Sequence, residues 1–286
     1  MPELPEIEIV KRSLFRTINK TKIIGVKINN KNLRYKIPHT FSKDLKGKKI
    51  LKITRRSKYL IFHFKKNLLL AHLGMSGKIL LVRNHDNKIF KTSFYYDLNI
   101  LKKHNHIYFI LNNGFILIYN DVRRFGFFKF INNKQDLVNR FSHLGPEPFF
   151  KNFNINYLLK YFFNKKKDIK SFLIDQKFVS GIGNIYASEI LFLSKIKPTT
   201  LAMKLSKKDC KRIISFSKSV LNKAIQRGGS SIRDFRNISG KSGNFQKEFK
   251  VYQRENLNCL RNKCSGKIKK ISISNRSTFF CNTCQK

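Results

Sequence analysis

Three residues near the start of the chain could perform nucleophilic and acid–base chemistry, namely Pro2, Glu3 and Glu6. If the initiator Met1 is removed, Pro2 carries a free secondary amine, and an α-amino pKa of about 8 leaves a useful neutral fraction at physiological pH. Attack of such an amine on an aldehyde-like carbon gives a charged iminium, an electron sink suited to elimination. The neighbouring carboxylates could act as general acid or base. The alternative is an ordinary helix start, in which proline and acids suit the first turn and the helix dipole.

Four cysteines near the other end of the chain have the spacing of metal ligands. They follow the pattern Cys259-x4-Cys264-x16-Cys281-x2-Cys284, and the fifth cysteine, Cys210, stands apart. Four thiolates in two close pairs are typical of a structural zinc site. Disulfides are the rival use of paired cysteines, but they are rare in a reducing compartment. We therefore expect one structural Zn²⁺ held by these four residues, and ordinary packing for Cys210.

The charge of the chain narrows the class of partner. It has 286 residues, with 60 Lys and Arg against 16 Asp and Glu, and a formal net charge of +44. A hydrophobic content of 41%, with 27 Phe, is enough for a core and excludes a disordered basic tail. Such a surplus requires a polyanion, with nucleic acid favoured over an anionic membrane surface. The chain is also rich in Lys, Asn, Ile and Phe, which indicates compositional bias, so only the sign of the charge is informative.

No apolar segment of the sequence has the length of a membrane span or the features of a signal peptide. The longest apolar runs, 68–71 and 115–118, have the length of strands. The first residues are acidic, with no apolar stretch behind them. We therefore expect a soluble, cytoplasmic protein with no membrane partner.

The elements that must position these residues differ between the two halves of the chain. Apolar residues at helical spacing predict an amphipathic helix over 3–17. Short β-rich runs separated by turn signals then predict a sandwich or a barrel. The predicted strands are 23–28, 50–53, 59–64, 79–82, 106–111, 115–119 and 126–130. The turn at Asn112-Asn113-Gly114 predicts a hairpin between two of them.

Prolines around 144–148 interrupt the chain, and the pattern then becomes helical. Predicted helices cover 154–163, 167–175, 184–195 and 206–227. A Gly, Ser and Asn-rich stretch that starts at 228 and ends near 243 predicts a loop. The tail has strand runs at 249–252 and 278–280 next to the cysteines. These changes predict domains at 1–147, 148–247 and 248–286.

Six ordered segments resemble the formamidopyrimidine-DNA glycosylases, the bifunctional base-excision enzymes for oxidised purines. The segments are Met1-Pro2-Glu3-Leu4-Pro5-Glu6, Arg55-Arg56-Ser57-Lys58-Tyr59-Leu60, His72-Leu73-Gly74-Met75-Ser76-Gly77, Asp121-Val122-Arg123-Arg124-Phe125-Gly126, His143-Leu144-Gly145-Pro146-Glu147-Pro148 and Gly181-Ile182-Gly183-Asn184-Ile185-Tyr186-Ala187-Ser188-Glu189. The implied fold is α+β, with an N-terminal helix and β-sandwich followed by a helical helix–two-turn–helix domain that ends in a zinc-ribbon β-hairpin. The resemblance also implies a monomer that acts on double-stranded DNA containing oxidised purines.

The resemblance implies a role for each residue of the catalytic site. Pro2 would be the nucleophile at C1′ of the damaged nucleotide. Glu3 would protonate the sugar ring oxygen, and Glu6 would support Glu3 by hydrogen bonding. Lys58 would act near the lesion and its phosphate. The implied reaction is base excision followed by β,δ-elimination through the iminium.

Two loops of the resemblance would fill the hole that a flipped base leaves in the duplex. Met75 and Phe125 would serve as apolar wedges, and Arg123 would pair with the orphaned opposite base. Judged by residue type alone, core packing is the commoner use of Met and Phe. The segment 229–250 would cap an everted oxidised guanine, and it includes Ser230, Ser231 and Arg233.

Phosphate contacts are implied for Lys170, Asn184 and Arg276. Asn184 precedes an apolar helix and is a good N-cap, and a helix N-terminus suits a phosphate. The sequence departs from the family pattern at two places. Ser171 stands where the family usually has Pro, which predicts a slightly less rigid turn with the same contact. The first cysteine pair is separated by four residues instead of two, which predicts a wider zinc knuckle.

Two alternative functions stay open at this point. The sibling enzyme endonuclease VIII prefers oxidised pyrimidines, but it typically has Gly at the position of Leu4. A non-catalytic basic zinc-ribbon protein that binds nucleic acid is the other alternative, and such a binder would need none of the catalytic residues.

Overall fold

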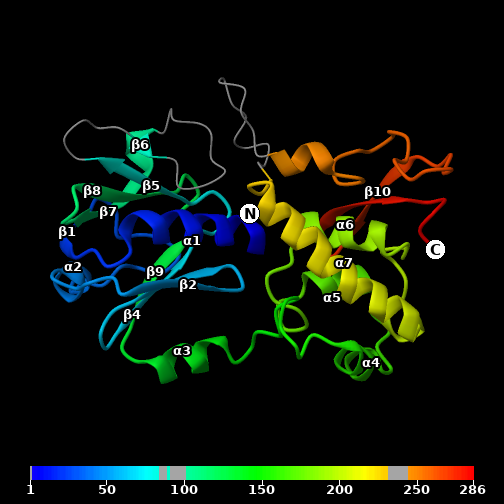
Figure 1. Cartoon of the computed structure of the whole chain (residues 1–286), viewed down its shortest axis with the longest axis horizontal. Helices are drawn as coiled ribbons and strands as arrows, with labels where there is room; N and C mark the ends of the chain where they lie inside the picture. Colours follow the sequence, from blue (N-terminus) through cyan, green and yellow to red (C-terminus); the bar gives the residue numbers. More distant parts are fainter. Residues whose placement is uncertain (1, 84–88, 91–100, 231–243) are drawn as a thin grey trace. The chain divides into compact units, whose positions relative to one another are not determined.

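The structure is a computed structural model that describes residues 2–83, 89–90, 101–230 and 244–286 (Figure 1). The chain divides into two compact units. The first comprises the chain up to Ser142 together with the segment that begins at Arg227, and the second comprises His143–Gln226 and Phe245–Lys286. The three domain boundaries expected from the sequence stay a prediction. None of the described helices combines the length and the apolar character that a membrane-spanning segment needs.

The first unit is built on two antiparallel sheets. The five-stranded sheet has the order β1-β7-β8-β5-β6, and the four-stranded sheet has the order β2-β3-β4-β9. Their bounds are β1 Ile23–Ile28, β2 Lys52–Arg56, β3 Tyr59–His63, β4 Leu68–His72, β5 Lys78–Arg83, β6 Ile89–Phe90, β7 Asn105–Leu111, β8 Phe115–Asn120 and β9 Phe127–Ile131. The helical elements of this unit are α1 Leu4–Ile18, α2 Phe41–Leu45, η1 Lys102–His104 and α3 Lys134–Phe141.

The core of this unit consists of side chains from both sheets and from α1. Alternate residues of the strands enter it, such as Leu60 and Phe62 of β3 and Leu117 and Tyr119 of β8, all of which are buried. The predicted apolar face of α1 is buried with them, as expected for an amphipathic helix. The alternation and the two sheets confirm the expected sandwich.

The described strands match the predicted ones, with two additions. All seven predicted strands are present, although β2 begins two residues after the predicted start. The hairpin at 112–114 joins β7 to β8, with Gly114 at φ +79°. The two strands that the sequence did not predict are β4 and the two-residue β6, and β4 reads Leu68-Leu69-Leu70-Ala71 and does not alternate. One face of β4 contributes to the main core, and its other face belongs to a second hydrophobic cluster that packs against α3. Both faces of the strand are therefore buried.

The second unit is mainly helical and ends in a β-hairpin. Its helices are α4 Ile155–Phe162, α5 Ile169–Ile174, α6 Asn184–Leu193, η2 Ala202–Lys204, α7 Lys207–Gln226 and η4 Asn244–Glu248. The hairpin pairs β10 (Ile268–Ile273) with β11 (Arg276–Cys281). Helix α6 is buried along nearly its whole length and forms the centre of the unit. Cys210 is fully buried on α7, which confirms the expected packing role.

One predicted strand in this unit is wrong. The run 249–252 contains bends and turns, and no described strand pairs with it. Its backbone N–H groups at Lys250, Val251 and Tyr252 donate instead to the buried carboxylate of Glu189 on α6, at 2.9, 3.0 and 2.9 Å. A side chain thus replaces the partner strand that these donors would otherwise require. The predicted loop at 228–243 lies mostly outside the described residues.

Candidate functional site

The residues at the start of the chain form a buried cluster of carboxylates. Pro2 is buried, and Glu3 and Glu6 are 3% and 1% exposed. Glu3 precedes α1 as its N-cap, and its backbone N–H donates to Oε2 of Glu6 at 2.9 Å. The hydrogen bond fixes the Glu6 carboxylate at the positive end of the helix dipole, where a negative charge is stabilised.

Ser230 completes this cluster from the far end of the first unit's sequence. Its backbone N–H and its hydroxyl donate to Oε1 of Glu6 at 2.9 and 3.0 Å. The preceding residue, Gly229, has φ +79°, and a Cβ there would lie 3.1 Å from Glu6 Oε1. Only glycine therefore lets the chain approach the carboxylate with this backbone. The resemblance implied that Ser230 belongs to a loop that caps the lesion, but the sequence gave no signal of its contact with Glu6. Ser231 and Arg233 lie outside the described residues.

Lys58 lies in the turn between β2 and β3 and is 5% exposed. The turn is held by Arg55, whose Nη1 donates to the carbonyl of Ser57 at 2.9 Å and whose Nε contacts Glu8 at 3.1 Å. Burial alone would raise the pKa of Glu8, but hydrogen bonds and charges from Lys11, Arg12 and Arg55 lower it below its usual value. Glu8 thus stays ionised and anchors the turn to α1. Sequence reasoning missed this acid, because its spacing resembles that of any exposed helical glutamate.

His72 stands at the end of β4, beside Lys58. Burial, together with the charges of Lys58 and Arg34, lowers the pKa of His72 from 6.5 to about 4. Its Nδ1 accepts the backbone N–H of Gly74 at 3.0 Å, which requires the neutral tautomer with the proton on Nε2. A neutral His72 therefore shapes the start of the loop that carries Met75.

The predicted wedge residues lie on two loops that cross between the sheets. Residues 73–77 connect β4 to β5, and residues 121–126 connect β8 to β9. Met75 is 39% exposed and Phe125 is 43% exposed, so neither has the core-packing role that residue type alone would favour. The guanidinium of Arg123 lies 4.6 Å from the centroid of the Phe125 ring. The structure therefore brings an exposed cation and an exposed aromatic ring together on one loop.

A single buried carboxylate, that of Asp121, organises both loops. Its Oδ1 accepts the hydroxyl of Ser76 at 2.5 Å and the N–H of Arg123 at 3.2 Å. Its Oδ2 accepts the hydroxyl of Tyr119 at 2.8 Å and the N–H of Gly126 at 2.9 Å. Asp121 is fully buried. Asp121 begins the sequence motif 121–126, but its residue type and spacing predict no such role.

Glycines allow the two loops to interlock around this carboxylate. A Cβ at Gly126 would lie 1.9 Å from Tyr119 Oη and 2.6 Å from the carbonyl oxygen of His72. A Cβ at Gly74, where φ is +62°, would lie 2.5 Å from the backbone nitrogen of Gly126. Neither position can accept a larger residue unless the loops separate.

In the second unit, Lys170 and Asn184 form one hydrogen-bonded group with the hairpin. The ammonium of Lys170 is fully buried and donates to Oδ1 of Asn184 at 2.8 Å and to Oγ1 of Thr278 at 2.9 Å. Nδ2 of Asn184 donates to the carbonyl of Ser277 at 2.8 Å. The next residue back along β11, Arg276, is exposed. The three predicted phosphate-binding residues therefore lie in one group, with Lys170 beneath the other two.

The N-cap predicted at Asn184 is wrong by one residue. Gly183 is the N-cap of α6 and Asn184 is its first helical residue, so the side chain of Asn184 serves the hairpin instead of the helix end. Ser171 keeps Lys170 in place through Asp168, which accepts both its N–H and its hydroxyl at 2.7 Å. Its hydroxyl also lies 2.8 Å from that of Ser274 in the β10–β11 turn. A proline at this position would make none of these hydrogen bonds.

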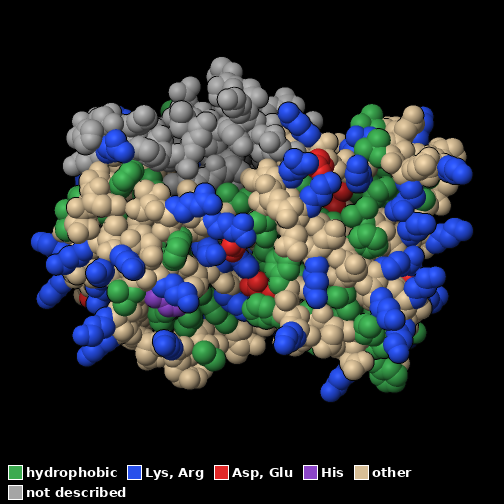
Figure 2. Space-filling view, viewed as in Figure 1, with side chains coloured by type: hydrophobic (Ala, Val, Ile, Leu, Met, Phe, Trp, Pro, Cys, Tyr) green, Lys and Arg blue, Asp and Glu red, His purple; other side chains and the backbone are tan. Residues whose placement is uncertain are grey.

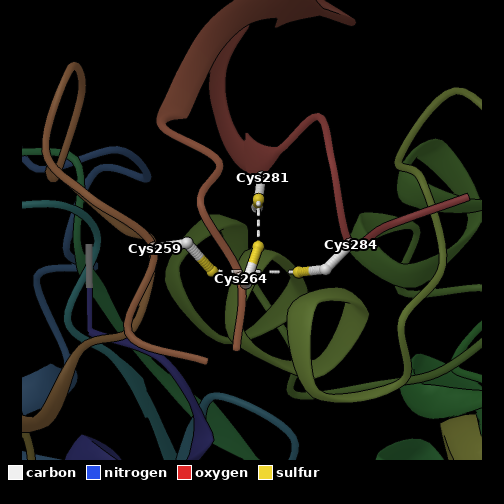
Figure 3. Close-up of side chains that lie close together, drawn as sticks. All are labelled: Cys259, Cys264, Cys281 and Cys284. Carbon is white, nitrogen blue, oxygen red and sulfur yellow. Dashed lines mark hydrogen bonds between the residues drawn. The ribbon is translucent and has the colours of Figure 1, made fainter. Parts of the chain in front are cut away.

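The four cysteines of the tail converge on one point (Figure 3). All four sulfurs lie within 4.8 Å of one another, with Cys259–Cys284 at 3.8 Å and Cys264–Cys281 at 3.7 Å. A tetrahedral zinc with Zn–S bonds of about 2.3 Å requires sulfur–sulfur distances of about 3.8 Å, so the cluster fits this ion. Burial opposes ionisation of Cys281, but backbone N–H groups of Cys284 and Thr283 lower its pKa to about 7. The tail therefore carries a structural zinc site, as expected.

Basic side chains are also spread over the visible face of the molecule (Figure 2), in addition to these groups. Figure 2 shows Lys and Arg scattered over the visible face, with few acidic side chains between them. They do not gather in one patch on this face. This distribution agrees with a compositional origin for most of the positive charge.

Comparison with known proteins identifies the two units. The family model for the formamidopyrimidine-DNA glycosylase N-terminal domain matches residues 1–128, and that for the formamidopyrimidine-DNA glycosylase H2TH domain matches residues 144–236. A third model, a zinc finger found in FPG and IleRS, matches residues 259–286. These matches span both units and the cysteine cluster.

Individual relatives match over the full length of the chain. The formamidopyrimidine-DNA glycosylase of Legionella pneumophila (strain Lens) is 40% identical over 285 residues, which cover 100% of this chain and 98% of the relative. A mutant of the Lactococcus lactis enzyme bound to a Fapy-dG-containing DNA has a TM-score of 0.86 at 34% identity, with complete coverage of both chains. MutM bound to DNA with carbocyclic 8-oxo-G has a TM-score of 0.83 at 34% identity, also with complete coverage. The chain therefore belongs to the formamidopyrimidine-DNA glycosylase family.

Proposed function

We propose that this protein removes oxidised purines, 8-oxoguanine and formamidopyrimidines, from duplex DNA and then cleaves the abasic site by β,δ-elimination. Membership of the family supports DNA glycosylase activity in base-excision repair. The relatives bound to Fapy-dG and to carbocyclic 8-oxo-G support the substrate class. The lyase step and the roles of single residues rest on the chemistry of this chain's own side chains.

Pro2 is the nucleophile of the proposed reaction. After removal of Met1, the lone pair of its amine attacks C1′ of the damaged nucleotide, and the glycosidic bond breaks with its electron pair going to the base. The nitrogen loses its proton, the C1′–O4′ bond opens, and an iminium forms between Pro2 and C1′. Loss of a C2′ proton then expels the 3′ phosphate, a second elimination expels the 5′ phosphate, and hydrolysis frees the amine.

The observation that carries this proposal is the pair of buried carboxylates beside Pro2. Glu3 is positioned to protonate O4′ as the sugar opens and to move protons in the eliminations. Glu6 accepts the N–H of Glu3 and both donors of Ser230, so it supports the start of α1 instead of reaching the substrate. An ordinary helix start would place its acids in water, whereas both of these are almost fully buried.

The remaining site residues bind and deform the DNA. We assign Met75 and Phe125 as wedges that fill the gap left by the everted base, and Arg123 as the partner of the opposite base. Their exposure on two rigidly connected loops supports this assignment. Lys58 contributes a buried positive charge near the lesion and its phosphate.

In the second unit, Asn184 and Arg276 bind the phosphate backbone, with Lys170 supplying charge from below. The buried ammonium of Lys170 holds Asn184 at the first turn of α6, where the dipole favours an anion. The ligands of the zinc ion are Cys259, Cys264, Cys281 and Cys284. This ion has no catalytic role in the proposal, because four thiolates leave it no open position.

Borohydride trapping tests the nucleophile directly. The Met1-processed protein should give a covalent complex with a duplex that carries 8-oxoguanine opposite cytosine, because borohydride reduces the iminium. Protein that retains Met1 is a matched control, since its Pro2 nitrogen is part of a peptide bond and cannot attack. It should bind the duplex within about twofold of the processed protein and give no trapped complex. Equal trapping by both forms would refute Pro2 as the nucleophile.

The same assay separates the other functions. Stronger trapping on a thymine glycol duplex than on the 8-oxoguanine duplex would favour an endonuclease VIII-like enzyme. Tight duplex binding with no excision and no trapping by processed protein would favour a non-catalytic binder. We further propose that the protein acts in the cytoplasm, since the matched relatives are bacterial DNA glycosylases, and that it acts as a monomer.

A further inference from the structure

The zinc knuckle of this chain is two residues wider than the family pattern, and one of its residues leaves the knuckle to contact a helix. The knuckle runs Cys259-Leu260-Arg261-Asn262-Lys263-Cys264. Nη2 of Arg261 donates to the carbonyl of Phe192 at 2.5 Å, and its guanidinium lies 4.7 Å from the centroid of the Phe192 ring. The backbone N–H of the same residue points at Sγ of Cys259, at 3.5 Å. Arg261 therefore joins the metal ligands to α6.

The contact with Phe192 places the guanidinium of Arg261 at the C-terminal end of α6. Phe192 is the penultimate residue of α6, so the guanidinium sits at the negative end of the helix dipole, where a cation is stabilised. The Nε of Arg261 is buried and has no hydrogen-bond partner within the described part of the chain. A phosphate would be repelled by the carbonyls of this helix end, so the arrangement suits attachment of the knuckle and not a DNA contact.

Helix α6 meets the tail at three places along its length. At its first residue, Asn184 bonds the carbonyl of Ser277 next to Arg276. In its middle, Glu189 accepts three N–H groups from 250–252. Near its last residue, the carbonyl of Phe192 accepts a hydrogen bond from Arg261. A helix of this length spans about 15 Å. The first contact therefore attaches the β10–β11 hairpin to one end of α6, and the last contact attaches the zinc knuckle to the other end.

We propose that Arg261 is a positioning residue, which docks the zinc knuckle on the last turn of α6 and thereby keeps Arg276 in register with Asn184 at the first turn. The wider knuckle supplies the chain length for this contact. The inference rests on the proposed function only in assigning Arg276 and Asn184 to DNA phosphates. Arg261 itself touches neither DNA nor the reacting atoms, and its effect on DNA passes through Arg276.

The first test measures how firmly the knuckle holds its metal, and it needs no DNA. Zinc-loaded wild type, Arg261→Ala and Lys263→Ala are mixed with excess chromogenic chelator, and zinc release is followed. Lys263→Ala is the matched control, because it removes one exposed charge from the same knuckle. We expect all three to bind one zinc, with release about tenfold faster in Arg261→Ala, since a charge-assisted contact is lost. Equal release from both variants would overturn the proposal.

The second test asks whether Arg261 acts through Arg276. Affinity for a duplex with an uncleavable tetrahydrofuran abasic analogue is measured for Arg261→Ala, Arg276→Ala and the double variant. We expect each single change to weaken binding about tenfold, and the double variant to bind as weakly as Arg276→Ala alone, because coupled positions are not additive. Additive losses would mean an independent role for Arg261 and would overturn the proposal. Lys263→Ala should shift affinity less than about twofold and add to Arg276→Ala.

A conservative variant separates positioning from a general loss of folding. Arg261→Lys keeps the positive charge and one donor for the Phe192 carbonyl but loses the planar stack on the ring. It should release zinc and bind the duplex at values between wild type and Arg261→Ala. Behaviour identical to Arg261→Ala together with a lowered melting temperature would indicate a structural defect and contradict the proposal. If wild-type protein fails to excise 8-oxoguanine, the proposed function falls, while zinc release and the coupling of the two arginines still decide this inference.

Discussion

The two DNA-binding regions proposed here are organised by buried charges of opposite sign. In the first unit, the Asp121 carboxylate holds the loops that expose Met75, Arg123 and Phe125. In the second unit, the Lys170 ammonium holds Asn184 to the hairpin that exposes Arg276. In both regions, one buried charged group forms hydrogen bonds to the segments that carry the exposed side chains.

The partners of the two buried charges differ in kind. Two of the four donors to Asp121 are backbone N–H groups of an irregular loop. No strand or helix partner could replace the Asp121 carboxylate as their acceptor. The acceptors of Lys170 are side chains on elements, α6 and β11, whose own backbones are already hydrogen-bonded. The wedge region should therefore depend on its buried charge more strongly than the phosphate-binding region does. Four predictions test this comparison, in order of their expected effect on the free energy of unfolding.

Asp121→Asn should destabilise the protein most, by about 3 to 4 kcal/mol. Asparagine offers one acceptor oxygen where four donors converge on two, so the donors to one of the two positions lose their acceptor. Excision of 8-oxoguanine should fall about a hundredfold as the wedges shift. Urea unfolding and single-turnover excision measure the two effects. Asp136→Asn, an exposed acid on α3, is the control and should change neither by much.

Acid should weaken the first unit through His72. Its folded pKa of about 4 lies below the unfolded value of 6.5, so the contribution to stability is present above pH 6.5 and is lost as the pH falls through 4. The full loss in the free energy of unfolding is about 3 kcal/mol. His72→Gln cannot titrate, so its unfolding free energy should fall less between pH 7 and pH 4 than that of wild type. The exposed His39→Gln should follow wild type, and identical profiles for all three would contradict the assignment.

Lys170→Met should cost about 2 kcal/mol, less than the change at Asp121. The variant removes a buried charge and leaves two neutral acceptors, on Asn184 and Thr278, without their donor. Duplex affinity should fall at least tenfold, while zinc content should stay at one ion per chain. Lys177→Met removes an exposed lysine of the same unit and serves as the control. A larger loss of stability here than in Asp121→Asn would reverse the comparison.

Phe125→Ala should change stability least, by no more than about 0.5 kcal/mol, because the ring is 43% exposed. Excision of 8-oxoguanine should nevertheless fall about tenfold or more, since the gap in the duplex loses its filling. The control is Phe150→Ala in the second unit, whose ring is 44% exposed. The two variants should unfold alike and differ only in excision. Equal excision would show that Phe125 is not a wedge.

The elements with a clear period or punctuation were predictable from the sequence. Helix α1 follows its apolar spacing, and the β7–β8 hairpin follows its Asn-Asn-Gly turn. Strand β4 was not expected, because burial on both faces removes the alternation that marks a strand. The residues at 249–252 favour a strand, yet Glu189 accepts the hydrogen bonds of their backbone N–H groups instead. Tertiary contacts overrode local preference at both places.

In the candidate site too, some residues were recognisable from the sequence and others were not. The cysteine spacing predicted a zinc site, and the cluster fits one. Pro2, Glu3 and Glu6 were recognisable as a group because they are neighbours in sequence. Asp121 and Glu189 carried no signal of their roles, since an acid that accepts four or three hydrogen bonds looks the same in sequence as an exposed one. Ser230 reaches Glu6 across more than two hundred residues of chain.

The sequence by itself determined the family and the metal site, because these depend on residue types at short spacings, and it indicated the residues that we propose to react. It also determined the sign of the charge, and on the face shown in Figure 2 the basic side chains are spread out. Only the tertiary structure decided which charges are buried and what they hold. Lys170 is one of 60 basic residues in the sequence, and its burial beneath Asn184 is what distinguishes it. Burial makes the difference because a charge removed from water must be matched by fixed partners, and those partners come from distant parts of the chain.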